Sequence, residues 1–489
     1  MAVEVSGGRP ITVKEQETAR VLVDRARQAM AAAASYDQAA VDRLCRAVAW
    51  AGGNEQTAIT LANMSVDESG MGSREPKRRA KVLGILRDAL RQKSIGIIEE
   101  IPEKGIVKYA KPAGVITSLI PVTSPYVTPI GIAIYAIKCK DAVIFSPHPG
   151  SRKTTNETVR VLRAALGRQQ APEDLLQCVE WPSIPLASEL MRTADLTIAT
   201  GGPAMVKAAY SSGKPAYGVG PGNATMVIDE TANVEEAARN TRVSKTNDYG
   251  SGCSADGNLI VEASIYDAML TELQLEGGYL VDEREKALLE KAYWDADGHR
   301  TPDTIARAGA VVATRAGFSI PADKSFLLVE ESRIGRQHRF STEKLGSVLA
   351  IFKYQGFDMA LDMVRRIFET GGKGHSCGIY SFDDDHIHRL ALVAPVSRIM
   401  VRQVQSASNA GTFTNGMPMT SSMGCGVWGG NITNENISLK HYMNVTWVSR
   451  PIPEDRPSEQ ELFGEFWSRN DRWKTNAQII PIKPNSANF

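Results

Sequence analysis

The sequence predicts a protein of the α/β class, with two doubly wound domains and a small additional element. Each domain is expected to hold a parallel sheet with helices on both faces. Three observations favour this fold. The chain has 489 residues, which is too long for a single hydrophobic core. Short apolar segments alternate with helical segments in its first half, and a second alternating set follows Cys253.

The first half of the chain starts with helical patterns. Residues 13–50 combine helical spacing of apolar residues with many alanines, and residues 76–93 continue as a charged amphipathic helix. Short apolar segments that fit buried strands follow, and the helix-like segment 154–166 separates two of them. These expected strands cover residues 106–109, 114–119, 141–145, 175–179 and 195–200. Their alternation with helices indicates a parallel sheet.

The second alternating set indicates a second α/β domain, with Cys253 near the junction of the two. Its segments are residues 259–261, 266–273, 286–292, 310–312 and 325–330. Near the end of the chain, residues 441–448 form an expected strand. Trp467, Trp473 and Phe489 then offer scattered apolar surface, as a packed C-terminal tail would.

Composition and charge exclude several classes of function. The chain has 43% hydrophobic and 23% charged residues, as ordinary soluble proteins do. Its 56 basic and 55 acidic residues nearly cancel, so neither a nucleic acid nor a membrane surface is an expected partner. The apolar run 129–137 is too short to span a bilayer, and residues 1–10 lack the apolar core of a signal peptide. We therefore expect a cytoplasmic protein.

Cys253 is the candidate nucleophile. It lies in the polar, glycine-rich segment 245–256, just ahead of an expected strand, where a thiol surrounded by backbone N–H groups can attack a substrate. The alternative is that it packs as a small buried residue. Cys377 and Cys425 also lie in glycine-rich stretches and are the rival nucleophiles. The six cysteines lie far apart, so we expect neither a metal site nor disulfides.

A glycine-rich turn upstream of this loop fits a phosphate. Gly201, Gly202 and Pro203 follow the expected strand 195–200 and precede the helical segment 204–212. This order offers backbone N–H groups and the positive end of a helix to an anion. The alternative is an ordinary turn with no ligand nearby.

Several motifs, taken together and in this order, resemble one enzyme family. They are Phe145-Ser146-Pro147-His148-Pro149, Ala199-Thr200-Gly201-Gly202-Pro203, Gly218-Val219-Gly220-Pro221-Gly222-Asn223, Gly374-His375-Ser376 and Met423-Gly424-Cys425-Gly426-Val427-Trp428-Gly429-Gly430-Asn431. With them the chain resembles the CoA-acylating aldehyde dehydrogenases along almost its whole length. It is similar above all to the acylating sulfoacetaldehyde dehydrogenases and to the aldehyde dehydrogenase half of the bifunctional aldehyde-alcohol dehydrogenases. Each motif is weak alone, but the set is specific.

The resemblance implies an aldehyde dehydrogenase-like fold. Residues 1–235 would form the dinucleotide-binding domain, with a strand near residues 100–112 that contributes to oligomerisation. Residues 236–430 would form the catalytic domain with the nucleophilic cysteine. Residues 431–489 would return to the cofactor domain and end in an oligomerisation tail. A homo-dimer or homo-tetramer is the expected assembly.

The resemblance also implies a reaction. The Cys253 thiolate would add to an aldehyde, hydride transfer to NAD or NADP would leave a thioester, and coenzyme A would take the acyl group. Ser124 stands where the family has an oxyanion-binding Asn, so it is either a substitute donor or the mark of an altered site. Residues 218–223 contain no Asp or Glu, whereas hydrolytic aldehyde dehydrogenases place a glutamate there to activate water.

Three other functions stay open on the sequence alone. The protein could be a hydrolytic aldehyde dehydrogenase, could reduce an acyl phosphate, or could be a catalytically silent binding or structural homologue. The joint presence of Cys253, the Gly201-Gly202 turn and Glu343 disfavours the silent alternative.

Further site residues follow from the resemblance. Ser146 and Pro147 would meet the adenine ribose, Gly201 and Gly202 the pyrophosphate, and Glu343 the nicotinamide ribose. Glu343 could instead be an exposed surface charge. His375 would polarise or deprotonate the thiol of coenzyme A, or else pack as an ordinary histidine.

The cation pair Arg152 and Lys153 bears on the choice between NAD and NADP. No acidic residue lies between Ser146 and this pair, so the two cations could meet the 2′-phosphate of NADP. The alternative is that both side chains open the next helix into solvent.

The substrate is expected to be a small polar or anionic aldehyde. The segment that lines the family's substrate channel is unusually polar here, and we expect Gln405, Ser406, Asn409 and Thr412 to bind the aldehyde. An alkyl aldehyde would leave such groups unpaired. Sulfoacetaldehyde is the leading candidate. The alternative is that these side chains face water or cap turns.

Overall fold

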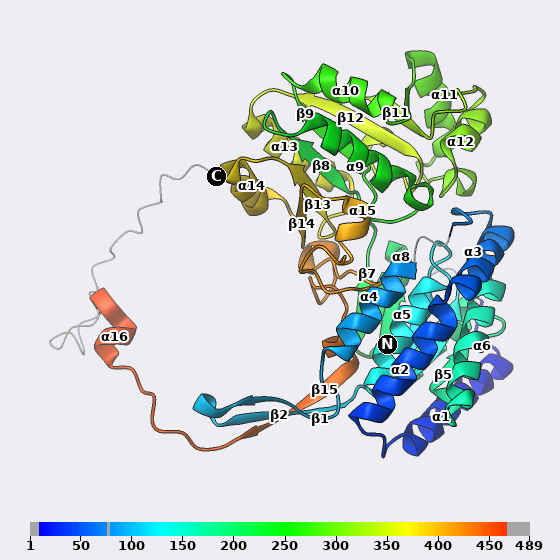
Figure 1. Cartoon of the computed structure of the whole chain (residues 1–489), viewed down its shortest axis with the longest axis vertical. Helices are drawn as coiled ribbons and strands as arrows, with labels where there is room; N and C mark the ends of the chain where they lie inside the picture. Colours follow the sequence, from blue (N-terminus) through cyan, green and yellow to red (C-terminus); the bar gives the residue numbers. More distant parts are fainter. Residues whose placement is uncertain (1–8, 76–78, 467–489) are drawn as a thin grey trace.

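In a computed structural model, which describes residues 9–75 and 79–466, the chain forms two α/β lobes and a projecting three-stranded ribbon (Figure 1). One lobe contains a five-stranded sheet and the other a seven-stranded sheet. This arrangement confirms the expected α/β class with parallel sheets. Residues 76–78 and the tail residues Trp467, Trp473 and Phe489 lie outside the described residues.

Helices at the start of the chain cover the first lobe. They are α1 (Val13–Ala32), α2 (Gln38–Gly53), α3 (Glu55–Ser69) and α4 (Arg79–Leu90). Thr12 starts α1 with a capping box, in which its hydroxyl accepts from the Glu15 N–H and Glu15 bonds back to the Thr12 N–H. Ala19, Val23 and Ala26 recur at helical spacing and are buried, so α1 presents one apolar face to the sheet.

The five-stranded sheet has the strand order β5-β4-β3-β6-β7, and all of its neighbours are parallel. The strands are β3 (Val115–Ile120), β4 (Ala142–Pro147), β5 (Leu176–Cys178), β6 (Leu196–Thr200) and β7 (Ala216–Val219). The connecting helices are α5 (Val127–Lys138), α6 (Arg152–Arg168), α7 (Ile184–Thr193) and α8 (Pro203–Tyr210). The strand order reverses between β3 and β6, and ligands of doubly wound sheets bind beyond the carboxyl ends of such strands.

The seven-stranded sheet has the order β10-β11-β12-β9-β8-β13-β14, also parallel throughout. Its strands are β8 (Thr225–Ile228), β9 (Asn258–Glu262), β10 (Gly278–Leu280), β11 (Phe326–Glu330), β12 (Val348–Tyr354), β13 (Cys377–Tyr380) and β14 (Ile399–Val401). Its helices are α9 (Val234–Thr246), α10 (Tyr266–Leu275), α11 (Glu283–Tyr293), α12 (Gly309–Ala316), α13 (Phe357–Thr370), α14 (Asp384–Val393) and α15 (Gln405–Ser408). Strand β8 pairs with β9 and β13, so this sheet begins before the expected boundary at residue 235.

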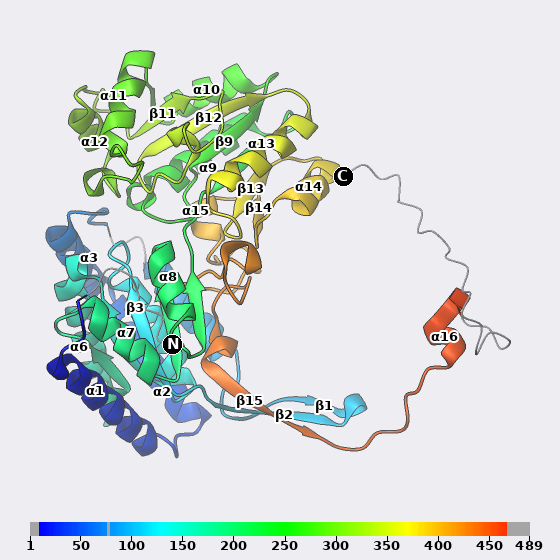
Figure 2. The same ribbon diagram turned by 180° about the vertical axis from the view of Figure 1, so that it is seen from behind.

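The small sheet is an antiparallel ribbon of β1 (Gly96–Ile101), β2 (Ile106–Pro112) and β15 (Met443–Ser449). It joins two strands from the first quarter of the chain to one near the end, and it projects from the first lobe in both views (Figures 1 and 2). The chain then runs on to the short helix α16 (Glu459–Phe463). In the described part of the chain, no helix is both long and apolar enough to cross a bilayer.

Candidate active site

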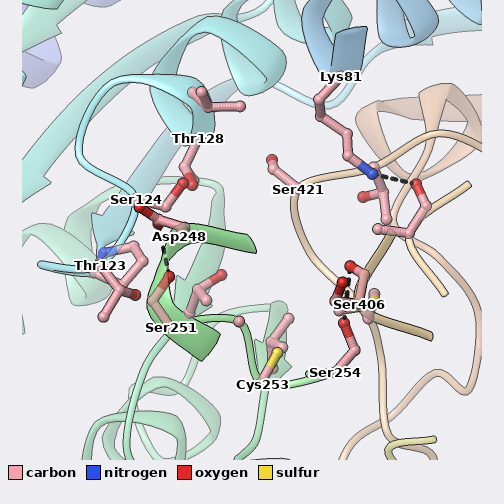
Figure 3. Close-up of a pocket in the computed structure, with 18 of the residues that line it drawn as sticks. Lys81, Thr123, Ser124, Thr128, Asp248, Ser251, Cys253, Ser254, Ser406 and Ser421 are labelled. Atoms are coloured by element: carbon pink, nitrogen blue, oxygen red, sulfur yellow. Dashed lines mark hydrogen bonds between the residues drawn. The ribbon is translucent and has the colours of Figure 1, made fainter. Parts of the chain in front are cut away.

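A cavity of about 620 Å³ lies where the loops of the two lobes meet. One wall is formed by the loops that follow β3 and β6, the two strands at which the order of the first sheet reverses. The opposite wall is formed by the loop around Cys253 and by residues 406–423. Figure 3 shows Cys253 at one end of this space and Lys81 at the other. The site therefore draws on both lobes.

The glycine turn after β6 opens onto this cavity. Gly201 and Gly202 line it, and Gly202 is the N-cap of α8 with no side chain capping the first turn. A Cβ added at Gly202 would meet no atom within 4 Å, so the backbone N–H groups of the turn can be approached closely. This geometry suits the pyrophosphate of a dinucleotide.

The cysteine loop is held by an unusual backbone. Asp248, Tyr249 and Gly250 have φ angles of 51°, 53° and 68°, and this left-handed stretch turns the chain sharply after α9. The Asp248 carboxylate fixes the turn, because it accepts from the Ser251 hydroxyl at 2.6 Å and from the Ser73 N–H at 2.7 Å. The loop thus presents Cys253 from a rigid frame.

The segment 218–223 approaches the cysteine closely. A Cβ at Gly222 would collide with the carbonyl oxygen of Cys253, so glycine is required there for packing. Gly220 and Pro221 line the cavity in this segment. No carboxylate stands on it to activate a water molecule.

His375 lies directly behind the thiol. Its Nε2 atom is 3.0 Å from the Cys253 sulfur, and its Nδ1 atom is 2.8 Å from the Ser376 hydroxyl oxygen. The ring is fully buried. The buried guanidinium of Arg398 fixes this segment by donating to the His375 carbonyl at 2.8 Å and to the Gly424 carbonyl at 2.7 Å.

Burial sets the protonation of this pair. It raises the pKa of the Cys253 thiol to about 12. Burial, together with the nearby positive charge of Arg398, lowers the pKa of His375 to about 3. Both groups are therefore neutral at pH 7. When Nδ1 carries the ring proton, Nε2 is free to accept the proton of the thiol.

The rival cysteines have a different setting. Cys377 lies in β13 and Cys425 in a tight glycine-rich stretch, and both are buried and absent from the cavity lining. Burial raises the pKa of both thiols. This setting favours packing roles for the two residues.

Glu343 faces the cavity and is firmly held. Its carboxylate accepts from the Gly222 N–H at 2.9 Å and lies 3.1 Å from the guanidinium of Arg300. Burial raises its pKa. The alternative of an exposed surface charge therefore does not apply to Glu343.

Comparison with known proteins identifies the family. A profile described as the aldehyde dehydrogenase family matches residues 10–276. The chain belongs to the aldehyde dehydrogenase family. Over 462 residues the enzyme is 42% identical to a sulfoacetaldehyde dehydrogenase of Acholeplasma sp, with 93% of this chain and 95% of that protein covered.

Two further similarities agree with this assignment. Over 465 residues the enzyme is 39% identical to an acylating sulfoacetaldehyde dehydrogenase of Bilophila wadsworthia, with 94% of this chain and 99% of that protein covered. A solved acetylating aldehyde dehydrogenase from Geobacillus thermoglucosidasius superposes with a TM-score of 0.87 at 33% identity, covering 92% of this chain and all of that one. The predicted fold and the resemblance to the acylating branch are confirmed.

The residues expected around the adenine ribose are not among those that line the cavity of this aldehyde dehydrogenase. Ser146 and Pro147 end β4 and are buried, and the cavity lining includes their neighbour His148 instead. Arg152 donates to the Glu180 carbonyl at 3.3 Å and its guanidinium lies 3.6 Å from the Trp181 ring centre. Neither Arg152 nor its exposed neighbour Lys153 lines the cavity.

The four residues expected to bind the aldehyde divide into two pairs. Ser406 and Thr412 line the cavity. Gln405 and Asn409 are fully buried and do not: the Gln405 amide donates to the Asp256 carboxylate at 2.5 Å, and the Asn409 amide donates to the Gln405 carbonyl at 2.9 Å. Only the amide nitrogens are bonded, because Gln405 Oε1 and Asn409 Oδ1 have no hydrogen-bond partner among the described residues. A role of these two residues in aldehyde binding stays a prediction.

Other cavity residues were missed from the sequence. They include Thr128, Arg300 and Ser421, which belong to no motif, and His148, which lies in a motif but was given no role. Nothing in the sequence indicates that Lys81 lines the cavity, because it lies in a charged helix, where a lysine is ordinarily a solvated surface residue. Only the packing of α4 against residues 410–421 brings it to the cavity. Ser124, which was predicted, lines the cavity beside Thr123.

Proposed function

We propose that this enzyme oxidises sulfoacetaldehyde to sulfoacetyl-CoA, with NAD(P)+ as hydride acceptor and coenzyme A as acyl acceptor. The two curated relatives described above act on sulfoacetaldehyde by name, and one of them is named as acylating. The observation that carries the acylating reaction is a thiol held 3.0 Å from a neutral imidazole beside a segment with no carboxylate. Residues 218–223, where hydrolytic enzymes place a water-activating glutamate, offer no base to a thioester formed there.

Cys253 is the proposed nucleophile. As its sulfur bonds to the aldehyde carbon, the thiol proton passes to Nε2 of His375 and the carbonyl π electrons move to oxygen. The Cys253 N–H and the Ser124 hydroxyl are the proposed donors to that oxygen, with Ser124 replacing the amide found in the family. The nearby charge of Arg398 disfavours a lasting imidazolium, so His375 has to release its proton again.

The cavity residues fit a dinucleotide. The open Gly201-Gly202 turn suits its pyrophosphate, and the Glu343 carboxylate suits ribose hydroxyl groups. When bound, NAD(P)+ supplies the hydride acceptor that turns the Cys253 adduct into a thioester. Glu343 keeps its position through Arg300 and the Gly222 N–H.

Transfer to coenzyme A uses the same pair. His375 would take the proton of the incoming CoA thiol as its sulfur bonds to the acyl carbon. The bond from that carbon to the Cys253 sulfur then breaks, and the departing thiolate recovers a proton from His375. The absence of an acid in residues 218–223 leaves the acyl group to this thiol.

A coupled assay tests this function directly. Purified enzyme receives sulfoacetaldehyde with NAD+ or NADP+, with and without coenzyme A, and absorbance reports reduced nicotinamide. CoA-dependent formation supports acylation, CoA-independent formation means hydrolysis, and no formation with any aldehyde means a silent homologue. A panel with glycolaldehyde, propionaldehyde and butyraldehyde tests the substrate, and higher kcat/KM on butyraldehyde than on sulfoacetaldehyde would defeat that part.

We also propose that the enzyme works as a homo-dimer or homo-tetramer, which we expect in the cytoplasm. Strand β15 carries the half-exposed Val445 and Val448, and Trp447 is 59% exposed. Such an apolar strand on a projecting ribbon suits pairing with a second copy of the chain. Light scattering during size-exclusion chromatography of the full-length protein should give the mass of a dimer or tetramer. The mass of a monomer would contradict this assembly.

A further inference from the structure

Arg398 is a buried cation with no anion bonded to it. It directly precedes β14, and it is 5% exposed. Its terminal nitrogens donate to three backbone carbonyls: Nη1 to His375 at 2.8 Å, and Nη2 to Gly424 at 2.7 Å and to Asn434 at 3.0 Å. Within the part of the chain that the structure describes, the guanidinium forms no ion pair, and its Nε atom has no hydrogen-bond partner. Carbonyl oxygens bond the cation but leave its formal charge uncancelled.

The same bonds hold the segment that carries the imidazole. The side chain of Arg398 bonds the His375 carbonyl, and the main-chain carbonyl of Arg398 accepts from the Cys377 N–H at 3.1 Å. The backbone next to the imidazole is therefore tied to Arg398 from two sides. This is the ring whose Nε2 atom lies 3.0 Å from the Cys253 sulfur.

The charge of Arg398 also acts on the nucleophile. Burial is the main cause of the raised pKa of Cys253; Glu343 and Cys425 raise this pKa further, whereas Arg398 lowers it. Burial and the charge of Arg398 both lower the pKa of His375. A guanidinium keeps its proton at any working pH, and the protein interior screens its field only weakly. Arg398 thus favours a negative charge on the sulfur and disfavours an imidazolium.

We propose that Arg398 is a positioning residue that holds His375 against the Cys253 sulfur and, through its uncancelled charge, stabilises the Cys253 thiolate. This inference rests on the nucleophile of the function proposed above. In acyl transfer, the bond from the acyl carbon to the sulfur breaks and its electron pair stays on the sulfur, so negative charge forms near the guanidinium. Arg398 does not line the cavity, so it acts through this pair.

Alkylation of Cys253 by iodoacetamide measures the thiolate without turnover. Arg398→Gln and Arg398→Met remove the charge, whereas Arg398→Lys keeps it but cannot span all three carbonyl groups. Iodoacetamide is uncharged, so the guanidinium does not attract the reagent itself. From pH 8 to pH 10, alkylation of both neutral variants should be slower by about fivefold or more at each pH, because the pKa of the thiol rises further. Arg398→Lys should stay within about threefold of the wild type.

Arg402→Gln is the matched control. Arg402 follows β14 outside the cavity lining and also donates to a backbone carbonyl, that of Ser381. Its replacement should leave the alkylation rate of Cys253 unchanged. A merely structural role of Arg398 would change Arg398→Lys as much as the neutral variants, because all three lose carbonyl bonds. That result, or wild-type rates in the neutral variants, overturns the inference. Thermal melting confirms that each variant is folded, and the second neutral variant serves if the first does not fold.

Steady-state kinetics separate this inference from the proposed reaction. With sulfoacetaldehyde and coenzyme A, kcat of Arg398→Met should fall about tenfold or more while KM changes little, and Arg398→Lys should recover most of the loss. An unchanged kcat in Arg398→Met would overturn the inference. If the wild type shows no CoA-dependent activity, only the proposed reaction fails, because the alkylation rates still decide the role of Arg398.

Discussion

Two polar loops meet at the cavity, and they use their polarity differently. Residues 245–256 aim a thiol into the cavity while Asp248 and Ser251 hold the turn behind it. In residues 403–414, two buried polar side chains donate hydrogen bonds to other protein groups: the Gln405 amide to Asp256 and the Asn409 amide to the Gln405 carbonyl. A polar loop therefore does not mark a ligand by composition alone. Buried loops also need polar side chains to satisfy buried polar groups.

The largest effect is expected from a substitution in the first loop, residues 245–256. Cys253→Ser should lower CoA-dependent aldehyde oxidation by about a thousandfold or more, because a serine hydroxyl is much less acidic than a thiol and His375, whose pKa is lowered by burial, is too weak a base to activate it. Nicotinamide binding, measured by fluorescence titration, should stay near the wild-type value. Cys178→Ser, a half-buried cysteine outside the cavity lining, is the control and should keep full activity. Residual activity above about a tenth in Cys253→Ser would refute the nucleophile.

The second prediction concerns the imidazole behind the thiol. His375→Asn should lower the CoA-dependent steady-state rate by about a hundredfold or more, as for loss of a general base. The replacement keeps a polar group near Ser376 but cannot take a proton from either thiol. His388→Asn, at an exposed position of α14, is the matched control. Unchanged turnover in His375→Asn would leave the residue a packing role only.

The fold was predictable where the signal is local. Strand β3 is buried along its whole length, and its apolar run predicted it to within a residue. Strand order is not local: the reversal between β3 and β6 places two loops at one cavity, and no pattern within either segment encodes that. The start of the second sheet at β8 was missed for the same reason, because only pairing with β9 and β13 assigns that strand.

The site was predictable where a motif carries the chemistry. Cys253 lies in a glycine-rich segment, the Gly201-Gly202 turn lies in a family motif, and Glu343 was assigned from the resemblance; all of them line the cavity. Lys81 and Ser421 lie in segments with no motif, and a lysine in an amphipathic helix is ordinarily solvated. Their contribution comes from tertiary packing, such as the bond from the Lys81 ammonium to Ala410, which is far away in sequence.

A third prediction concerns the pH dependence of the reactivity of Cys253 in the first loop. Because burial raises the pKa of Cys253 to about 12, the thiol stays protonated at pH 7, and its thiolate fraction grows about tenfold per pH unit. Alkylation of Cys253 by iodoacetamide should therefore keep rising from pH 7 to pH 10 without a plateau. Mass spectrometry of the labelled peptide gives the rate. A plateau near neutral pH would indicate a thiolate–imidazolium pair instead.

The smallest effects test the second loop, by comparing one inward side chain with one that faces the cavity. Gln405→Leu removes the amide that donates to the Asp256 carboxylate, which is left with one donor fewer. Burial already raises the pKa of Asp256 to about 6. We expect a loss of about 1–3 kcal/mol in the free energy of unfolding. Thr412→Val, at the cavity wall, should change stability by less than about 0.5 kcal/mol and the KM for the aldehyde by a few-fold. Denaturant unfolding and steady-state kinetics on both variants decide the matter. If Gln405→Leu raised KM with no loss of stability, the amide would belong to the substrate site after all, and the contrast between the two loops would disappear.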